Sequence, residues 1–199
     1  GLRMYRFSVD WSRVEPAEGT YDDGALEQYA RWCRQLRASG IEPLITLHHF
    51  TEPAWFESKG GFELRENIAH FERFVERVLG ALAPHCTHWC TVNELNGYAV
   101  CGWLAGVHPP GKRSLGQTLS VIRHILVAHT RASRLIRAAF AERTEKPTIS
   151  IAFNYIWFCS RGWSSPLSSI VASFLNFFWN FCGNDALVYG RFSLFPFNF

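Results

Sequence analysis

Apolar and polar positions along the chain follow two patterns, one typical of buried strands and one typical of amphipathic helices. Four short runs rich in apolar, β-branched and aromatic residues are predicted to be strands: residues 4–9, 41–47, 87–92 and 148–153. Between them, apolar residues recur every three or four positions and predict helices at residues 22–39, 66–82 and 117–140. Strands that are apolar on both faces and alternate with helices indicate a parallel sheet.

Two large classes of parallel α/β fold fit this order. No Gly-x-Gly-x-x-Gly follows the first predicted strand, so a dinucleotide-binding fold has no positive support. In the other class, the (β/α)8 TIM barrel, the active site collects at the carboxyl ends of the strands. Polar residues follow all four predicted strands: Asp10-Trp11-Ser12-Arg13, His48-His49, Asn93-Glu94 and Asn154-Tyr155. We therefore favour a site shared by the strand ends over ordinary loop polarity.

Composition narrows the class of ligand. The 20 Lys and Arg residues exceed the 17 Asp and Glu residues by only three and are scattered, which gives little support to nucleic-acid binding. The six cysteines include no Cys-x-x-Cys pair, so buried thiols are favoured over metal ligands, and no metal or cofactor is expected. The 17 Phe, 8 Trp and 6 Tyr fit a packed core or a cleft whose walls stack on flat ligand faces.

The two ends of the chain are less regular. Residues 162–184 carry no charge, but serines and asparagines interrupt the apolar run. A membrane span needs about 20 mostly apolar residues, so a buried or lid-like helix is favoured and no membrane is expected. The chain opens Gly-Leu-Arg-Met-Tyr without an initiator methionine and is interpreted as starting inside a longer sequence. A cytoplasmic location is favoured, and no oligomeric state is predicted.

The third strand end holds the clearest candidate for catalysis. Glu94 follows an apolar strand, sits beside Asn93 and lies close in sequence to Trp89. Carboxyl groups serve as general acids and bases in catalysis, and the amide of a neighbouring asparagine can hydrogen-bond a substrate hydroxyl. Taken alone, a glutamate at a strand end is more often a cap or an ion-pair partner. Trp89, like Trp11, fits either the core or a cleft wall.

Polar chemistry also appears on the first two strands. Adjacent strand residues point to opposite faces, so His48 and His49 are not expected to bind one metal ion together. One of them is expected to contact a substrate hydroxyl and the other to be structural. Arg6 lies within the first strand, where a buried guanidinium needs a carboxylate partner. We expect that partner on another strand.

Several motifs occur in order along residues 3–155. They are Tyr5-Arg-Phe-Ser-Val-Asp-Trp-Ser-Arg-Val-Glu-Pro16, Leu47-His-His-Phe50, Lys59-Gly-Gly-Phe62, Trp89-Cys-Thr-Val-Asn-Glu94, Gly102-Trp-Leu-Ala-Gly106, Pro110-Gly111 and Ala128-His129. The series resembles the successive signatures of family 1 glycoside hydrolases, the β-glucosidase family. The resemblance implies a (β/α)8 barrel, retaining hydrolysis of small-molecule β-glycosides and no cofactor.

The resemblance also implies roles for four residues. Glu94 matches the acid/base glutamate, which protonates the leaving glycosidic oxygen and then deprotonates the attacking water. Asn93 matches the asparagine that holds the sugar 2-hydroxyl, a contact expected to strengthen in the transition state. His49 matches a histidine that binds the glycone, and Arg6 matches the arginine that orients the nucleophile. Asn154 and Tyr155 are weaker matches and are not expected to be catalytic.

The sequence departs from the family pattern at several points. Leu95 stands where the family usually has proline, and Phe50-Thr51-Glu52-Pro53 replaces the common Trp-Asp-Leu-Pro. No Thr-Glu-Asn-Gly motif, which holds the family's nucleophile, occurs in the 199 residues, and the family's first strand is absent. Retaining chemistry needs two carboxyl groups about 5–5.5 Å apart. Asp10, expected in a structural turn, and Glu52 are not expected to supply the second.

We therefore expect residues 1–199 to form one partial barrel domain of about four β/α units, since a closed barrel typically takes about 250 residues. The expected function is that of a retaining β-glycosidase whose catalysis requires the missing strands, so the isolated chain is expected to be inactive. One alternative is a truncated remnant with at most weak sugar binding. Another, a metal-dependent barrel hydrolase, is disfavoured because the histidines lack ligand spacing.

Overall fold

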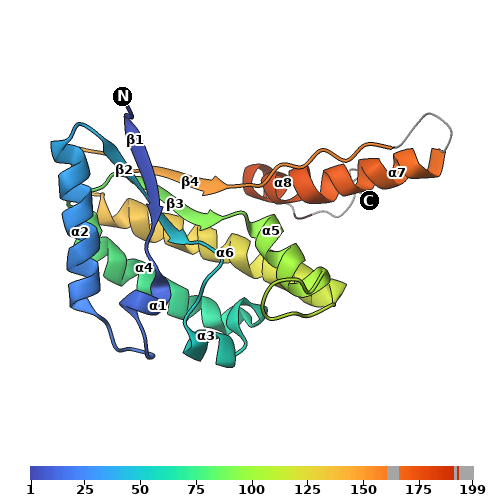
Figure 1. The fold of residues 1–199 in the computed structure, drawn as a ribbon, viewed down its shortest axis with the longest axis horizontal. Helices are drawn as coiled ribbons and strands as arrows, with labels where there is room; N and C mark the ends of the chain where they lie inside the picture. Colours follow the sequence, from blue (N-terminus) through green and yellow to red (C-terminus); the bar gives the residue numbers. More distant parts are fainter. Residues whose placement is uncertain (161–165, 191, 193–199) are drawn as a thin grey trace. The chain divides into compact units, whose positions relative to one another are not determined.

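The computed structural model describes residues 1–160, 166–190 and 192 (Figure 1). The described residues form a parallel sheet of four strands in chain order: β1 (Met4–Ser8), β2 (Glu42–His48), β3 (His88–Asn93) and β4 (Thr148–Ala152). Met4 pairs with Glu42, Leu44 with His88, and His88 with Thr148. Each strand lies within one residue of the bounds that the sequence predicts, and the parallel sheet is confirmed.

The chain divides into two compact units. The first comprises residues 1–94 and 127–152 and contains the sheet. The second comprises residues 95–126 and the described residues from Phe153 onward. The long helix α6 (Leu115–Ala139) contributes to both units.

In the first unit, helices α2 (Asp23–Ala38), α4 (Ile68–Leu82) and the later half of α6 lie along one face of the sheet (Figure 1). The Asp22 side chain accepts a hydrogen bond from the Ala25 backbone N–H at 2.9 Å, so Asp22 is the N-cap at which α2 begins. The apolar positions predicted to share one face of α4 are all buried: Ile68, Phe71, Phe74, Val75, Val78 and Leu82. The three predicted helices are confirmed.

The alternation of side chains gives β1 two different faces. Phe7 packs on α2, with its ring 6.2 Å from that of Tyr29 and 5.9 Å from that of Trp32. Arg6 and Ser8 lie on the opposite face because strand side chains alternate. A groove of about 370 Å³ runs beside β1 and is lined by Tyr5, Phe7, Trp32, Gln35, Leu36 and Ser39. β1 is an outer strand of the sheet, so this apolar groove lies next to an exposed edge.

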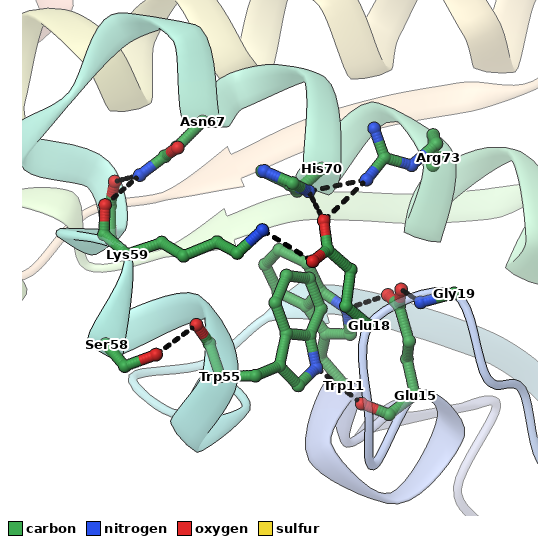
Figure 2. A network of polar contacts seen from close by, with 11 residues as sticks. Trp11, Glu15, Glu18, Gly19, Trp55, Ser58, Lys59, Asn67, His70 and Arg73 are labelled. Carbon is green, nitrogen blue, oxygen red and sulfur yellow. Dashed lines mark hydrogen bonds and ion pairs between the residues drawn. The ribbon is translucent and has the colours of Figure 1, made fainter.

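The loops that follow β1 and β2 are braced against each other through Glu15 (Figure 2). Trp11, in the short helix α1 (Trp11–Val14), donates from Nε1 to Glu15 Oε2 at 2.7 Å, and the Gly19 N–H donates to Oε1 at 2.9 Å. Trp55, in α3 (Ala54–Ser58), donates to the Glu15 carbonyl at 2.9 Å. Glu15 is only 1% exposed. The bonds from Trp11 and Gly19 satisfy its carboxylate, which would otherwise be costly to bury.

Ion pairs around Glu18 reinforce the same junction. Its carboxylate contacts Lys59, which follows α3, and Arg73 and His70 of α4 (Figure 2). The bond from Lys59 lowers the pKa of Glu18. Between α3 and α4, the short helices η1 (Gly61–Glu63) and η2 (Arg65–Asn67) complete the loop, and Asn67 donates to the carbonyls of Lys59 and Gly61. The carboxyl side of β1 and β2 is therefore held by specific polar contacts.

The second unit contains α5 (Leu95–Ala99), the π-helix η3 (Val100–Leu104), α7 (Pro166–Asn176), the π-helix η4 (Phe177–Phe181) and α8 (Cys182–Tyr189). The last three are contiguous, which agrees with the single C-terminal helix that the sequence predicts. Residues 161–165, part of the uncharged run, lie outside the described residues. Among the helices described, none is long and apolar enough to cross a membrane.

Asparagine side chains hold the segment that follows β4 against this helical run. Asn176 donates to the Phe158 carbonyl at 2.7 Å and accepts from the Phe158 N–H at 2.9 Å. Asn180 pairs in the same way with the Ile156 carbonyl at 2.8 Å and N–H at 3.1 Å. Residues four apart on a helix are separated by about 6 Å, close to the spacing of residues two apart in an extended chain. The two carboxamides therefore match the backbone groups of alternate residues.

Trp11 should be essential for stability because it joins the aromatic core to the buried Glu15. Its ring lies 4.7 Å from that of Phe56 and 5.0 Å from that of Phe74. We expect Trp11→Ala to lower the free energy of unfolding by about 3–5 kcal/mol. Trp11→Phe should lower it by about 1–3 kcal/mol, because Glu15 loses its indole donor while remaining buried. Urea unfolding followed by far-UV circular dichroism measures both changes.

The matched control is Trp157→Phe, since Trp157 is 72% exposed. It should change the free energy of unfolding by no more than about 0.5 kcal/mol. Wild-type stability in Trp11→Phe would contradict the role assigned to the indole N–H.

Candidate active site

The four residues singled out in the sequence, Arg6, His49, Asn93 and Glu94, all belong to the first unit. Arg6 lies on β1, His49 directly follows β2, Asn93 ends β3, and Glu94 comes next. Each of the last three therefore lies at the carboxyl end of a strand. The candidate site is built on the sheet itself rather than on one loop.

Arg6 connects three strands through its guanidinium. Its Nε donates to Thr46 Oγ1 on β2 at 2.8 Å, and one Nη donates to Asn93 Oδ1 on β3 at 2.6 Å. The same Nη lies 3.6 Å from Cys90 Sγ. These partners lie on other strands, as expected, and are uncharged. The expected carboxylate partner, which the resemblance identifies with the family's nucleophile, stays a prediction. The burial expected for Arg6 is wrong: the side chain is exposed, so water solvates the charge that a buried guanidinium would have to pair.

The pairing of β3 with β4 is irregular near Asn93, and both Cys90 and Asn93 contact the Arg6 guanidinium. The register between β3 and β4 shifts between these two residues. In a regular strand, residues three apart point to opposite faces, so a shared contact of Cys90 and Asn93 marks a departure from regular alternation. Thr91, in between, bonds instead to Nδ1 of His129 on α6 at 2.6 Å. The irregular strand end thus brings Asn93 to the guanidinium of Arg6.

The two adjacent histidines have different surroundings. His48 is 1% exposed, and its Nε2 lies 2.6 Å from Glu52 Oε1, with the ring edge-on to Phe62 at 5.4 Å. His49 is exposed, and its Nδ1 lies 2.8 Å from Ser8 Oγ. Glu52 is therefore engaged with the buried histidine.

Two residues of the site region have positive φ, which is uncommon for any residue except glycine. Phe50 has a φ of 68° and Glu94 a φ of 46°. Both directly follow the polar residue at a strand end. The Glu94 N–H donates to the Ala152 carbonyl at 2.8 Å, so the strained residue is tied to β4. Such conformations cost about 1–3 kcal/mol and persist where the surrounding contacts impose them.

The electrostatics of the site act on His49. Burial lowers the pKa of His49 below its ordinary value, the Arg6 cation and His48 lower it further, and Glu94 opposes them. The lowered pKa favours the neutral form of the His49 imidazole. A neutral imidazole has one donor and one acceptor nitrogen, both suited to hydroxyl groups.

The other sequence candidates lie outside this group. Asp10 caps α1 by accepting from the Ser12 N–H at 2.9 Å, which agrees with the turn expected there. Trp11 and Trp89 are 1% and 0% exposed and belong to the core rather than to a cleft wall. Asn154 belongs to the second unit, where its carbonyl accepts from Asn96 at 2.7 Å. Ser8 and Thr46 were missed, although period-two alternation from Arg6 places Ser8 on the same face.

The cysteines behave mainly as buried thiols. Cys33, Cys86, Cys90 and Cys182 are buried, as expected, whereas Cys159 is exposed and Cys101 partly so. Burial raises the pKa of Cys33 to about 11 and those of Cys86 and Cys182 to about 12. Over the ranges that the structure describes, no three His, Cys, Asp or Glu side chains gather in a way that could hold a metal ion.

Comparison with known proteins identifies the family. The model described as "Glycosyl hydrolase family 1" matches residues 1–193. The chain belongs to glycosyl hydrolase family 1. Among curated members, Beta-glucosidase A of Thermotoga maritima is 31% identical over 79% of this chain and 35% of its own length. Beta-glucosidase A of Acetivibrio thermocellus is 30% identical over 78% of this chain and 35% of its own length.

Solved structures of family 1 agree. A beta-glycosidase from Pyrococcus horikoshii superposes with a TM-score of 0.87 at 32% identity, covering 97% of this chain and 44% of that one. The family 1 β-glucosidase from Thermotoga maritima gives 0.88 at 28% identity, with 97% and 43% covered. The chain spans about a third of the length of the curated relatives named above. Its parallel sheet and helices are part of a family 1 TIM barrel, which confirms the fold class predicted from the sequence.

The effect of Arg6 on His49 can be measured by NMR titration of the imidazole. In Arg6→Gln the pKa of His49 should rise toward its ordinary value, because the cation that disfavours protonation is removed. Arg6→Lys should keep the low pKa, and Arg31→Gln on α2 serves as a charge-matched control. Since the folded pKa lies below the unfolded one, His49 favours folding at high pH, and this contribution is lost as pH falls through the folded pKa. A pKa unchanged in Arg6→Gln would contradict the coupling.

Proposed function

We propose that the complete protein is a retaining β-glycosidase of the β-glucosidase type, with Glu94 as its acid/base residue. The observation that carries the proposal is the guanidinium of Arg6 on β1 beside a carboxamide, an imidazole and a carboxyl group at the ends of β2 and β3. In a TIM barrel this edge of the sheet is where active sites lie. Curated relatives over most of the chain are named β-glucosidases.

The hydrogen bonds of the site support a division of roles. Asn93 accepts from Arg6 through Oδ1, which leaves its Nδ2 group to donate to the sugar 2-hydroxyl. His49 is bonded at Nδ1, so Nε2 is the nitrogen available to the glycone. Arg6 keeps two uncharged partners and a solvent-exposed charge, which suits it to orient an incoming carboxylate.

Glu94 would act twice in the reaction. It first protonates the glycosidic oxygen as the bond to the aglycone breaks, and it then removes a proton from the water that hydrolyses the glycosyl-enzyme. The positive φ of Glu94 supports this role, because strained non-glycine residues cluster at functional sites. A residue with only a capping role would be expected to relax.

The nucleophile is proposed to come from the part of the barrel outside these 199 residues. The two other acids near strand ends are already engaged, Asp10 as a helix cap and Glu52 with His48. Without a second carboxylate near Glu94 a glycosyl-enzyme cannot form. The alternative function, a remnant with at most weak sugar binding, follows if no longer chain supplies that group.

Glu94→Gln in the complete protein tests the acid/base role. Hydrolysis of alkyl β-glucosides, whose leaving groups need protonation, should fall by about 10²–10⁴-fold. The first step with dinitrophenyl β-glucoside should be nearly unchanged, because that leaving group departs without a proton. Burst and steady-state kinetics separate the steps, and Glu76→Gln on the exposed side of α4 is the control. Equal losses on both substrates would contradict the assignment.

The 199-residue chain alone should show no turnover of a chromogenic β-glucoside, because it lacks the nucleophile. The assay compares the chain with its Glu94→Gln variant, so that any background hydrolysis is recognised. Turnover that requires Glu94 and disappears in Asp10→Asn would show that the nucleophile is present after all.

A further inference from the structure

Ser8 is a polar residue of the site to which the proposed function assigns no role. Its hydroxyl oxygen lies 2.8 Å from Nδ1 of His49. Ser8 is on β1 and His49 directly follows β2, so the contact joins two neighbouring strands at their carboxyl ends. Alternation along β1 places Ser8 on the same face as Arg6.

A hydroxyl and a neutral imidazole nitrogen can bond in either direction, and the surroundings favour donation by Ser8. Within the ranges that the structure describes, His49 is the side chain with which Ser8 bonds, so acceptance would leave the serine O–H without a protein acceptor. The unprotonated imidazole nitrogen is also a better acceptor than a hydroxyl oxygen. Burial and the charge of Arg6 keep the ring neutral, so one nitrogen must be unprotonated.

We propose that Ser8 is a positioning residue whose hydroxyl donates to Nδ1 of His49, so that the imidazole carries its proton on Nε2 and offers Nε2–H to a sugar hydroxyl. The bond made by one ring nitrogen sets the protonation of the other. It also restrains the rotation of an exposed ring that is otherwise in contact with Phe50, 5.3 Å away. The proposal rests on the proposed function for its ligand, but its tautomer is a property of the chain itself.

The first experiment reads the tautomer directly. The 199-residue chain labelled with ¹⁵N-histidine is studied above the pKa of His49 by long-range ¹H–¹⁵N NMR, and His49→Gln identifies the signals. The wild type should show an unprotonated Nδ1 and a protonated Nε2. Ser8→Ala should give averaged nitrogen shifts as both tautomers become populated, whereas Ser8→Thr should keep the wild-type pattern.

The matched control is Ser58→Ala, which removes a serine hydroxyl that donates to the Trp55 carbonyl. Its His49 signals should equal those of the wild type. Amide dispersion in the same spectra reports whether each variant is folded, and Ser8→Cys replaces Ser8→Ala if the latter is not. A proton on Nδ1 in the wild type, or an unchanged tautomer in the folded Ser8 variant, would overturn the proposal.

The second experiment asks whether the tautomer matters for the sugar. In the complete protein, Ser8→Ala should raise KM for a β-glucoside roughly fivefold with a smaller change in kcat, and Ser8→Thr should restore KM. An altered tautomer with unchanged KM would overturn the positioning role. If the complete protein hydrolyses no β-glycoside, the proposed function fails, while the NMR result still decides whether Ser8 sets the tautomer.

Discussion

The hydrogen bond from Arg6 to Asn93 is the contact on which the candidate site depends. It joins β1 to β3 across β2, and the bond from the same guanidinium to Thr46 includes β2 as well. A parallel sheet aligns strands through their backbones, but its ladder bonds do not fix the side chains at the strand ends. Arg6 fixes two of these side chains, because its planar guanidinium donates to Thr46 on β2 and to Asn93 on β3. The carboxamide beside Glu94 is oriented as a result.

Departures from regular backbone geometry complete this arrangement. The register between β3 and β4 shifts near Asn93, which contacts Arg6, and the positive φ of Glu94 follows immediately. These features carry a conformational cost, so the rest of the unit must supply compensating contacts. The buried Glu15, bonded by indole and backbone N–H groups, braces the loops after β1 and β2. The polar contacts of Glu15 thus stabilise the loops next to the irregular strand ends.

The sequence predicted the regular parts well because they follow simple periodicity. Short apolar runs and helical spacing are local features of the chain, and the structure agrees on β1–β4, α2, α4 and α6. The motifs likewise suffice to indicate family 1. Contacts that depend on a distant partner were not foreseen. The pairing of Asn176 and Asn180 with the backbone of Phe158 and Ile156 is an example, since nothing local to either segment indicates the other.

Arg6 shows the same limit in a more instructive way. A guanidinium within an apolar strand predicts a carboxylate partner only if it is buried, and burial depends on the whole barrel. In this chain Arg6 is exposed and bonded to uncharged groups, so water solvates its charge. Its positive charge nevertheless adds to the effect of burial in lowering the pKa of His49. A carboxylate brought to the same face would meet an arginine already oriented by two strands. The part of the candidate site in this chain is therefore preorganised to receive a negative charge, as the proposed function requires.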